Sequence, residues 1–211
     1  MLNVYLLRHG QTQWNAEGNR YCGRTDIPLT ETGMRQAEIV RAQLVDVKLD
    51  AIYSSPLQRA YHTAQIAGGD KKVITDPRLI EADFGKWEGK TKAEFTKEEP
   101  ELWEAWDHDP TISRAGGCGE TGSEVVRRVE EFFNDVLQKH VGTNILVVAH
   151  NGVNRLYLAH KLGMHLRHYR RIVQENSSVT LFALDESGEI TLKRLNSKGE
   201  GCISNWRDGY V

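Results

Sequence analysis

The sequence predicts an α/β domain with a mostly parallel central sheet, and three observations support this prediction. Short β-rich runs alternate with helical patterns along the chain, as expected for successive βα units. The run at 145–149 is continuously aliphatic, which is typical of a strand covered on both faces. The 211 residues are 39% apolar, which suffices for one large core, so we expect residues 1–211 to form a single domain.

The strands are predicted from β-rich runs of four to seven residues bounded by turn residues. Four of them are expected in the parallel part of the sheet, at 4–7, 51–54, 72–75 and 145–149. Two further runs, 179–184 and 189–195, flank the turn Glu186-Ser187-Gly188. This spacing predicts an antiparallel hairpin near the end of the chain.

The helices are predicted from N-terminal capping residues. Thr30 is expected to cap a helix that runs to about residue 45, and Thr121 with Glu124 forms a capping box for a helix to about 139. Ser55 followed by Pro56 predicts another start, with the serine as N-cap and the proline at the first helical position. A fourth helix is expected to follow residues 151–152 and to end near 163.

The segment 84–119 is less regular and rich in Trp, Gly and charged residues. We interpret it as an excursion over the edge of the sheet that covers a substrate, and not as a second domain. Trp103 and Trp106 are three residues apart on a predicted helix at 100–107, so they share one face. Packing into the core of the excursion is the expected role of both indoles.

Composition narrows the function classes. The net charge of −2 does not favour a nucleic-acid partner, which usually requires a basic excess. No apolar run approaches the roughly 20 residues that span a membrane. Cys22, Cys118 and Cys202 are far apart and form no Cys-x-x-Cys pair, so we expect no zinc site and no disulfide framework, and we predict reduced thiols and a cytoplasmic location.

Two predicted strands end in histidine. The first is followed by Arg8-His9-Gly10 and the strand at 145–149 by His150-Asn151-Gly152. In an open parallel sheet, ligands bind beyond the carboxyl ends of the strands. If these two strands are neighbours, both imidazoles face one crevice, and Arg59 in the first turn of the following helix can reach the same rim. Planar guanidinium groups pair bidentately with phosphate oxygens, so the pattern predicts a phosphate site.

The chain resembles the histidine phosphatase superfamily, in the branch of the cofactor-dependent phosphoglycerate mutases and their phosphatase relatives. The resemblance rests on motifs in the family's order from residue 4 to about 155. They are Leu7-Arg8-His9-Gly10-Gln11-Thr12 with Trp14-Asn15, Pro28-Leu29-Thr30-x-x-Gly33, Tyr53-Ser54-Ser55-Pro56-Leu57 with Arg59-Ala60, Leu79-x-Glu81 with Phe84-Gly85-x-Trp87-Glu88-Gly89, Gly119-Glu120-Thr121 and Val147-Val148-Ala149-His150-Asn151-Gly152. It implies a phosphoglycerate mutase-like fold, a three-layer α/β/α sandwich.

The resemblance also implies roles for individual residues. His9 is the nucleophile that forms a phosphohistidine, and Arg8, Arg59 and His150 hold the non-bridging phosphate oxygens. Glu81 exchanges protons with the leaving group and with water. No metal and no cofactor take part. The substrate contacts expected around this centre are Arg8, Asn15, Cys22, Gly23, Arg59, Asn151 and Gly152.

Several of these assignments have alternatives. Asp83 lies two residues from Glu81 and can serve as the proton donor instead, and Asn15 can act only as a turn cap. Cys22 stands where some phosphatase relatives have a glutamine, whose amide hydrogen bonds a thiol cannot supply. We interpret the basic run His165-Leu166-Arg167-His168-Tyr169-Arg170-Arg171 as a solvated surface.

The predicted function is metal-independent hydrolysis of small phosphate monoesters. A cofactor-dependent phosphoglycerate mutase is the alternative, because the same central residues serve both reactions. Residues 90–94 depart from the mutase pattern and the chain is shorter than a typical mutase, which favours hydrolysis. A non-catalytic phosphate-binding protein is the remote alternative, since it predicts loss of an essential group. The expected partner is a small phosphorylated metabolite, whose identity stays open, as does the oligomeric state.

Overall fold

The computed structural model describes residues 1–198 and folds them around one six-stranded sheet. The elements in chain order are β1 (Leu2–Arg8), α1 (Gln13–Ala16), α2 (Glu31–Gln43), β2 (Ala51–Ser54), α3 (Gln58–Gly68), β3 (Val73–Thr75), η1 (Pro77–Leu79), η2 (Gly85–Trp87), α4 (Lys92–Glu98), α5 (Pro100–His108), η3 (Ala115–Gly117), α6 (Gly122–Lys139), β4 (Asn144–Ala149), α7 (Asn151–Lys161), η4 (Leu166–Arg171), β5 (Val179–Leu184) and β6 (Ile190–Ser197).

The sheet has the strand order β3-β2-β4-β1-β5-β6. The first four strands are parallel, and β5 and β6 add an antiparallel hairpin beside β1. The predicted mostly parallel sheet and the terminal hairpin are therefore confirmed.

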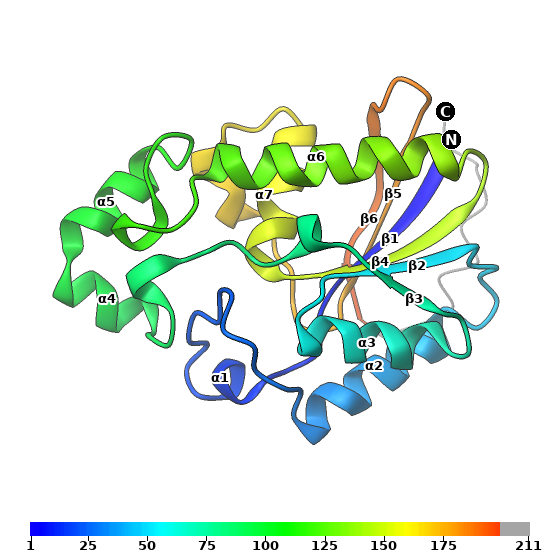
Figure 1. The fold of residues 1–211 in the computed structure, drawn as a ribbon, viewed down its shortest axis with the longest axis horizontal. Coiled ribbons are helices and arrows are strands. Elements are labelled where there is room, and N and C mark those ends of the chain that lie inside the picture. The colour runs from blue at the N-terminus through cyan, green and yellow to red at the C-terminus, as the bar shows by residue number, and fades with distance from the viewer. Residues whose placement is uncertain (199–211) are drawn as a thin grey trace.

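Helices cover both faces of the sheet, which gives the three layers of the predicted α/β/α sandwich (Figure 1). Because side chains alternate across a strand, Val4 and Leu6 of β1 pack in the larger hydrophobic cluster with α6 and α7. Tyr5 and Leu7 pack in the smaller cluster with α2 and α3. The central strands thus read as nearly continuous apolar runs because both of their faces are buried.

The predicted helix start at Ser55 and Pro56 is wrong in detail. Helix α3 begins at Gln58, with Leu57 as an N-cap that makes no side-chain capping bond. The Ser55 hydroxyl instead lies 2.7 Å from Nε2 of His150 and 3.3 Å from the backbone N–H of Leu57. The predicted caps Thr30 and Thr121 are confirmed, and Thr121 forms the expected capping box with Glu124.

The excursion contains four short helical elements, η2, α4, α5 and η3, which lie beyond one end of the sheet (Figure 1). Trp87, Phe95, Trp103 and Trp106 form an aromatic cluster in which Trp87 and Phe95 stack at a centroid distance of 4.7 Å. Trp106 is buried, and Trp103 packs partly buried against the same core, as predicted. No helix among residues 1–198 has the length and apolarity needed to cross a membrane.

Candidate active site

A cavity of about 100 Å³ lies at the carboxyl ends of β1 and β4. Its lining contains four arginines, one carboxylate and three aromatic rings, and consists of Arg8, His9, Asn15, Asn19, Arg20, Tyr21, Cys22, Glu81, Phe84, Asn151, Gly152, Arg155, Tyr169 and Arg170. The volume is well below the 300–1,000 Å³ of pockets for drug-sized ligands. The cavity therefore suits a small anion.

The two histidines meet because β1 and β4 are parallel neighbours. Arg8 and Ala149 are paired in register, so the residues that follow them, His9 and His150, leave the sheet side by side. Their ring centroids are 5.2 Å apart, and both side chains are buried. The predicted juxtaposition of the two imidazoles is thus present in the structure.

The hydrogen bonding of His9 determines which ring nitrogen carries a lone pair. Nδ1 lies 2.7 Å from the carbonyl oxygen of Gly10, and a carbonyl only accepts hydrogen bonds, so Nδ1 carries the proton. Burial, followed by the nearby guanidiniums of Arg59 and Arg8, holds the pKa of His9 well below its usual range. His9 is therefore a neutral imidazole with a free lone pair on Nε2, the form that acts as a nucleophile.

His150 is also neutral in the folded protein. Burial lowers its pKa well below the ordinary value, and Arg59 and His9 add to the effect. Its Nε2 is engaged by the Ser55 hydroxyl at 2.7 Å, whereas its buried Nδ1 has no hydrogen-bond partner among residues 1–198. The positive charge of the site therefore comes from arginine, and His150 contributes a polar nitrogen without a partner among residues 1–198.

Arg8 and Arg59 supply this charge from two elements. Burial lowers the pKa of Arg8 to about 10, so the group is still a cation at neutral pH. Its Nη1 donates to the carbonyl of Gln174 at 2.9 Å. Arg59 is completely buried and donates to the carbonyls of Thr25 and Gly23 at 2.8 and 2.7 Å. In both guanidiniums the buried Nε–H has no acceptor among residues 1–198.

The loop at residues 23–25 is shaped by Glu88, a residue of the family motif to which the sequence assigned no role. The Glu88 carboxylate accepts from the backbone N–H groups of Arg24 and Thr25 at 2.9 and 3.2 Å, and from the Thr25 hydroxyl at 2.7 Å. Gly23 has φ +49°, and a Cβ there would lie 1.9 Å from Glu88 Oε1. The glycine therefore lets the loop close on Glu88 and aim its carbonyls at Arg59.

Glu81 is held at the edge of the cavity by the N-terminus of α7. Its oxygens accept from the backbone N–H groups of Gly152 and Val153 at 3.0 and 2.9 Å, and from that of Ala82 at 2.9 Å. A Cβ on Gly152 would lie 2.8 Å from Glu81 Oε1. The glycine thus permits this close approach, and Glu81 lines the same cavity as His9.

Asn15 and Cys22 line the cavity through an internal network. Asn15 closes a capping box with Thr12, whose backbone N–H donates to Asn15 Oδ1 at 3.1 Å. Asn176 donates to the same oxygen at 3.2 Å. The Sγ of Cys22 lies 3.7 Å from the Thr12 hydroxyl, and burial raises the pKa of the thiol. Asn15 therefore acts as a turn cap and lines the cavity at the same time.

Some of the predicted site residues line the cavity, and others lie behind this lining. Those that line the cavity are Arg8, His9, Asn15, Cys22, Glu81, Asn151 and Gly152. Arg59, His150 and Gly23 lie behind this lining: His150 contacts the His9 ring, and the Gly23 carbonyl accepts from Arg59. Asp83, the alternative proton donor, lies on a different groove along α6 and accepts from the Gly85 N–H at 2.9 Å. Cys202 lies outside the described residues.

The interpretation of residues 165–171 as a solvated surface is wrong at three positions, Leu166, Tyr169 and Arg170. Arg167 and Arg171 are exposed, but Tyr169 is buried and both Tyr169 and Arg170 line the cavity. The segment is the 3-10 helix η4, in which residues three apart share a face. Leu166, Tyr169 and Ile172 all point inward, and this period of three was the signal available in the sequence.

We expect the two neutral histidines to make the protein less stable below about pH 6.5. The folded protein holds both unprotonated, whereas each takes up a proton near pH 6.5 in the unfolded chain. The unfolded state then binds more protons, so the free energy of unfolding falls as the pH drops. Between pH 7 and 5.5 the expected loss is about 1 kcal/mol for each histidine.

Urea unfolding at several pH values measures this loss, and the His9→Gln variant is the control. Of the two buried histidines, that variant retains only His150, so its free energy of unfolding should fall about half as much over the same pH interval. Equal pH dependence in the two proteins would contradict the assignment of a neutral His9.

The fold is a six-stranded α/β sandwich. At the carboxyl ends of its strands lie two buried imidazoles and several guanidinium groups. Together they define a protein with a histidine-centred anion site. The family model described as histidine phosphatase superfamily, branch 1, matches residues 4–198. The chain belongs to this superfamily, which confirms the resemblance drawn from its motifs.

Individual relatives agree with this membership. Phosphoserine phosphatase 1 of Hydrogenobacter thermophilus is 34% identical over 92% of this chain and 92% of its own length. A probable 2-carboxy-D-arabinitol-1-phosphatase of Arabidopsis thaliana is 35% identical over 98% of this chain, which spans 44% of that protein. A crystal structure of a phosphoserine phosphatase mutant from Entamoeba histolytica in complex with phosphoserine has a TM-score of 0.85 at 29% identity, covering 93% of this chain and 98% of that one.

Proposed function

We propose that this protein hydrolyses small phosphate monoesters through a phosphohistidine formed on Nε2 of His9. One observation carries the proposal. Around the neutral His9 ring, three buried polar groups have no hydrogen-bond partner among residues 1–198, namely Arg8 Nε, Arg59 Nε and His150 Nδ1. Leaving such groups unpaired costs stability, and their convergence on one imidazole suits a tetrahedral phosphate. The similarity to named phosphatases supports the same function.

The reaction proceeds in two displacements. The Nε2 lone pair of His9 attacks phosphorus, the bond from phosphorus to the ester oxygen breaks, and the leaving oxygen takes a proton from the Glu81 carboxyl group. The Glu81 carboxylate then takes a proton from a water molecule, which attacks the phosphohistidine and releases inorganic phosphate and neutral His9. Arg8, Arg59 and His150 stabilise the charge on the equatorial oxygens, the main requirement of phosphoryl transfer.

Among the two candidate proton donors we assign the role to Glu81. It lines the same cavity as His9, and the N-terminus of α7 orients its carboxylate. Asp83 is directed to the other groove, where Arg24 lies 3.9 Å away. Asn15 and the loop residue Cys22, with Asn151 and Gly152 of α7, complete the walls around the ester, and Gly23 supports Arg59 from behind these walls.

Trapping of the covalent intermediate tests the function. The purified protein is mixed with a radiolabelled phosphate ester, quenched in denaturant, and assayed for phosphate release and for protein-bound label. We expect release of inorganic phosphate, acid-labile but alkali-stable label on His9, and no effect of EDTA. Inhibition by EDTA that added metal reverses, or label on another residue, would contradict the mechanism.

A phosphoglycerate mutase gives a different result in the same assay. With bisphosphoglycerate as phosphoryl donor, it interconverts 3- and 2-phosphoglycerate rapidly and releases little phosphate. Phosphate release in excess of interconversion is expected here. The single-domain organisation of residues 1–211, the covering role of 84–119 and the cytoplasmic location stay predictions.

A further inference from the structure

Besides Arg8, the same cavity is lined by two arginines, Arg155 and Arg170, that the hydrolysis of a phosphate ester does not require. Arg155 lies on α7, and Arg170 lies on η4. Both line the cavity together with Tyr21 and Tyr169. Arg155 is four residues after Asn151 on the same helix, so it stands about one turn, or roughly 5 Å, along α7 from the His9 end.

Within the described residues 1–198, neither guanidinium is held in an ion pair. Among residues 1–198 no carboxylate forms an ion pair with Arg155 or Arg170; Arg155 Nε donates to the carbonyl of Tyr169 at 3.3 Å, and Arg170 donates to the Tyr21 hydroxyl. The buried Nε–H of Arg170 has no acceptor in that part of the chain. Among residues 1–198, Glu81 is the only carboxylate that lines the cavity, and it is bound to the N-terminus of α7.

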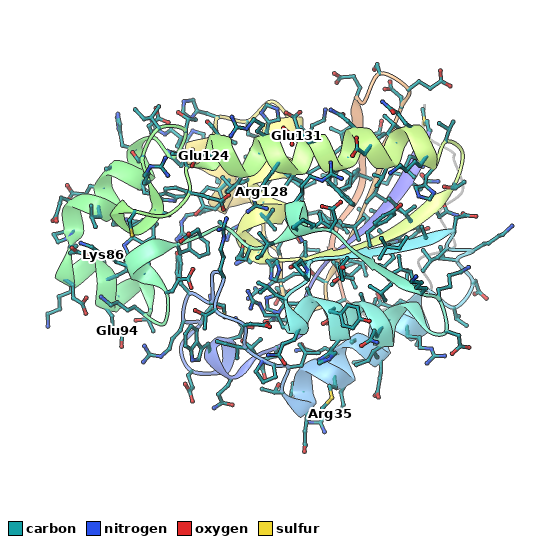
Figure 2. The ribbon with its side chains drawn as sticks, viewed as in Figure 1. Arg35, Lys86, Glu94, Glu124, Arg128 and Glu131 are labelled. Carbon is teal, nitrogen blue, oxygen red and sulfur yellow. The ribbon has the colours of Figure 1, made fainter. Side chains whose placement is uncertain are left out.

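Two other arginines of this region are paired with carboxylates. Arg20 also lines the cavity, but its Nη1 lies 2.7 Å from Glu94 on α4, which is labelled in Figure 2. In the groove along α6, Arg128 pairs with Glu120 at 3.0 Å (Figure 2). Arg155 and Arg170, by contrast, both lie over the ring of Tyr169, at 5.2 and 5.5 Å from its centre, without an ion pair among residues 1–198.

The surrounding aromatic residues hold Arg170 in place. Its guanidinium lies 4.5 Å from the ring centre of Trp103 and 5.5 Å from that of Tyr169. The Tyr169 hydroxyl in turn accepts from Nε1 of the buried Trp106 at 3.2 Å. This bracing preorganises the cation for a ligand, because little side-chain entropy is left to lose on binding.

We propose that Arg155 and Arg170 bind a carboxylate of the substrate, so that the preferred esters carry a carboxylate a few bonds from the phosphoryl group. The inference rests on the proposed function and specifies its substrate class. Guanidinium groups recognise the planar carboxylate fork, and the small cavity favours this compact anion over a second phosphate. Arg8 and Arg59 remain available for the phosphoryl group.

Matched pairs of esters test the inference. O-phosphoethanolamine has a hydrogen where O-phosphoserine has its carboxylate, and glycerol 3-phosphate has a neutral hydroxymethyl group where 3-phosphoglycerate has its carboxylate. We expect wild-type kcat/KM to favour the carboxylate member of each pair on the order of 10- to 100-fold, the effect of charged hydrogen bonds. In Arg155→Gln and Arg170→Gln this preference should fall toward one.

The control is Arg171→Gln, which removes the same charge from an exposed neighbour of Arg170 that does not line the cavity. It should keep the wild-type preference. A preference that is absent in the wild type, or that survives in both cavity variants, would overturn the inference while leaving hydrolysis intact. If the wild type hydrolyses none of these esters, the proposed function itself fails.

A second phosphate is tested as an alternative source of the anion. 1,3-propanediol bisphosphate is compared with propyl phosphate in the wild type and in Arg155→Gln. We expect a smaller preference here than for the carboxylate pairs. A larger preference that Arg155→Gln abolishes would replace the carboxylate by a phosphate and overturn the assignment.

Discussion

Replacing His9 by alanine is expected to reduce the turnover of p-nitrophenyl phosphate on the order of 10⁴-fold or more, because the substitution removes the nucleophile. The residual arginines still bind phosphate but cannot form the covalent intermediate. His9 is buried between Arg8 and Arg59 and carries its lone pair on Nε2, so no other side chain takes its place. Initial rates of nitrophenolate release measure the effect.

His62→Ala is the matched control for this variant, because His62 is an exposed histidine of α3. It should retain the wild-type rate. Circular dichroism and the melting temperature of His9→Ala show whether the fold is intact. A folded His9→Ala protein that keeps more than a few per cent of the wild-type rate would refute the phosphohistidine mechanism.

Arg59→Ala is expected to lower kcat/KM on the order of 10²- to 10³-fold, the usual effect of removing one preorganised donor from a developing oxyanion. The guanidinium is fully buried, and two of its nitrogens are held by the carbonyls of Thr25 and Gly23. These contacts fix the guanidinium plane and leave the Nε–H group, which has no acceptor among residues 1–198, available to a ligand. Lysine preserves the charge but not this fork, so Arg59→Lys should recover only part of the activity.

Steady-state kinetics and thermal melting together separate catalysis from folding in this series. Arg35→Ala is the control, since Arg35 is exposed on α2 and pairs only weakly with Glu31 at 3.9 Å (Figure 2). A folded Arg59→Ala protein with near wild-type kcat/KM would contradict the role of Arg59. Full activity in Arg59→Lys would show that a positive charge at this position is enough for catalysis and that the guanidinium fork is not needed.

Much of the central site was predictable because it is built from strand ends. Arg8-His9 and His150 each follow a recognisable apolar strand, and parallel neighbours bring such ends together. Arg59 was predictable for a related reason, since it follows β2, which pairs with β4. The start of α3 was not, because the Ser55 hydroxyl that would cap a helix in isolation is hydrogen-bonded to His150, which is 95 residues away.

The sequence by itself determined the class of fold, the family and the residues at the reacting centre, because strand periodicity and short motifs are local properties of the chain. The tertiary structure decided what surrounds that centre. Glu88 shapes the loop that holds Arg59, and Arg155 of α7 and Arg170 of η4 both lie over the ring of Tyr169, through contacts between separate segments. Only folding reveals which of many arginines are left without a carboxylate, because charge pairing depends on distance in space and not along the chain.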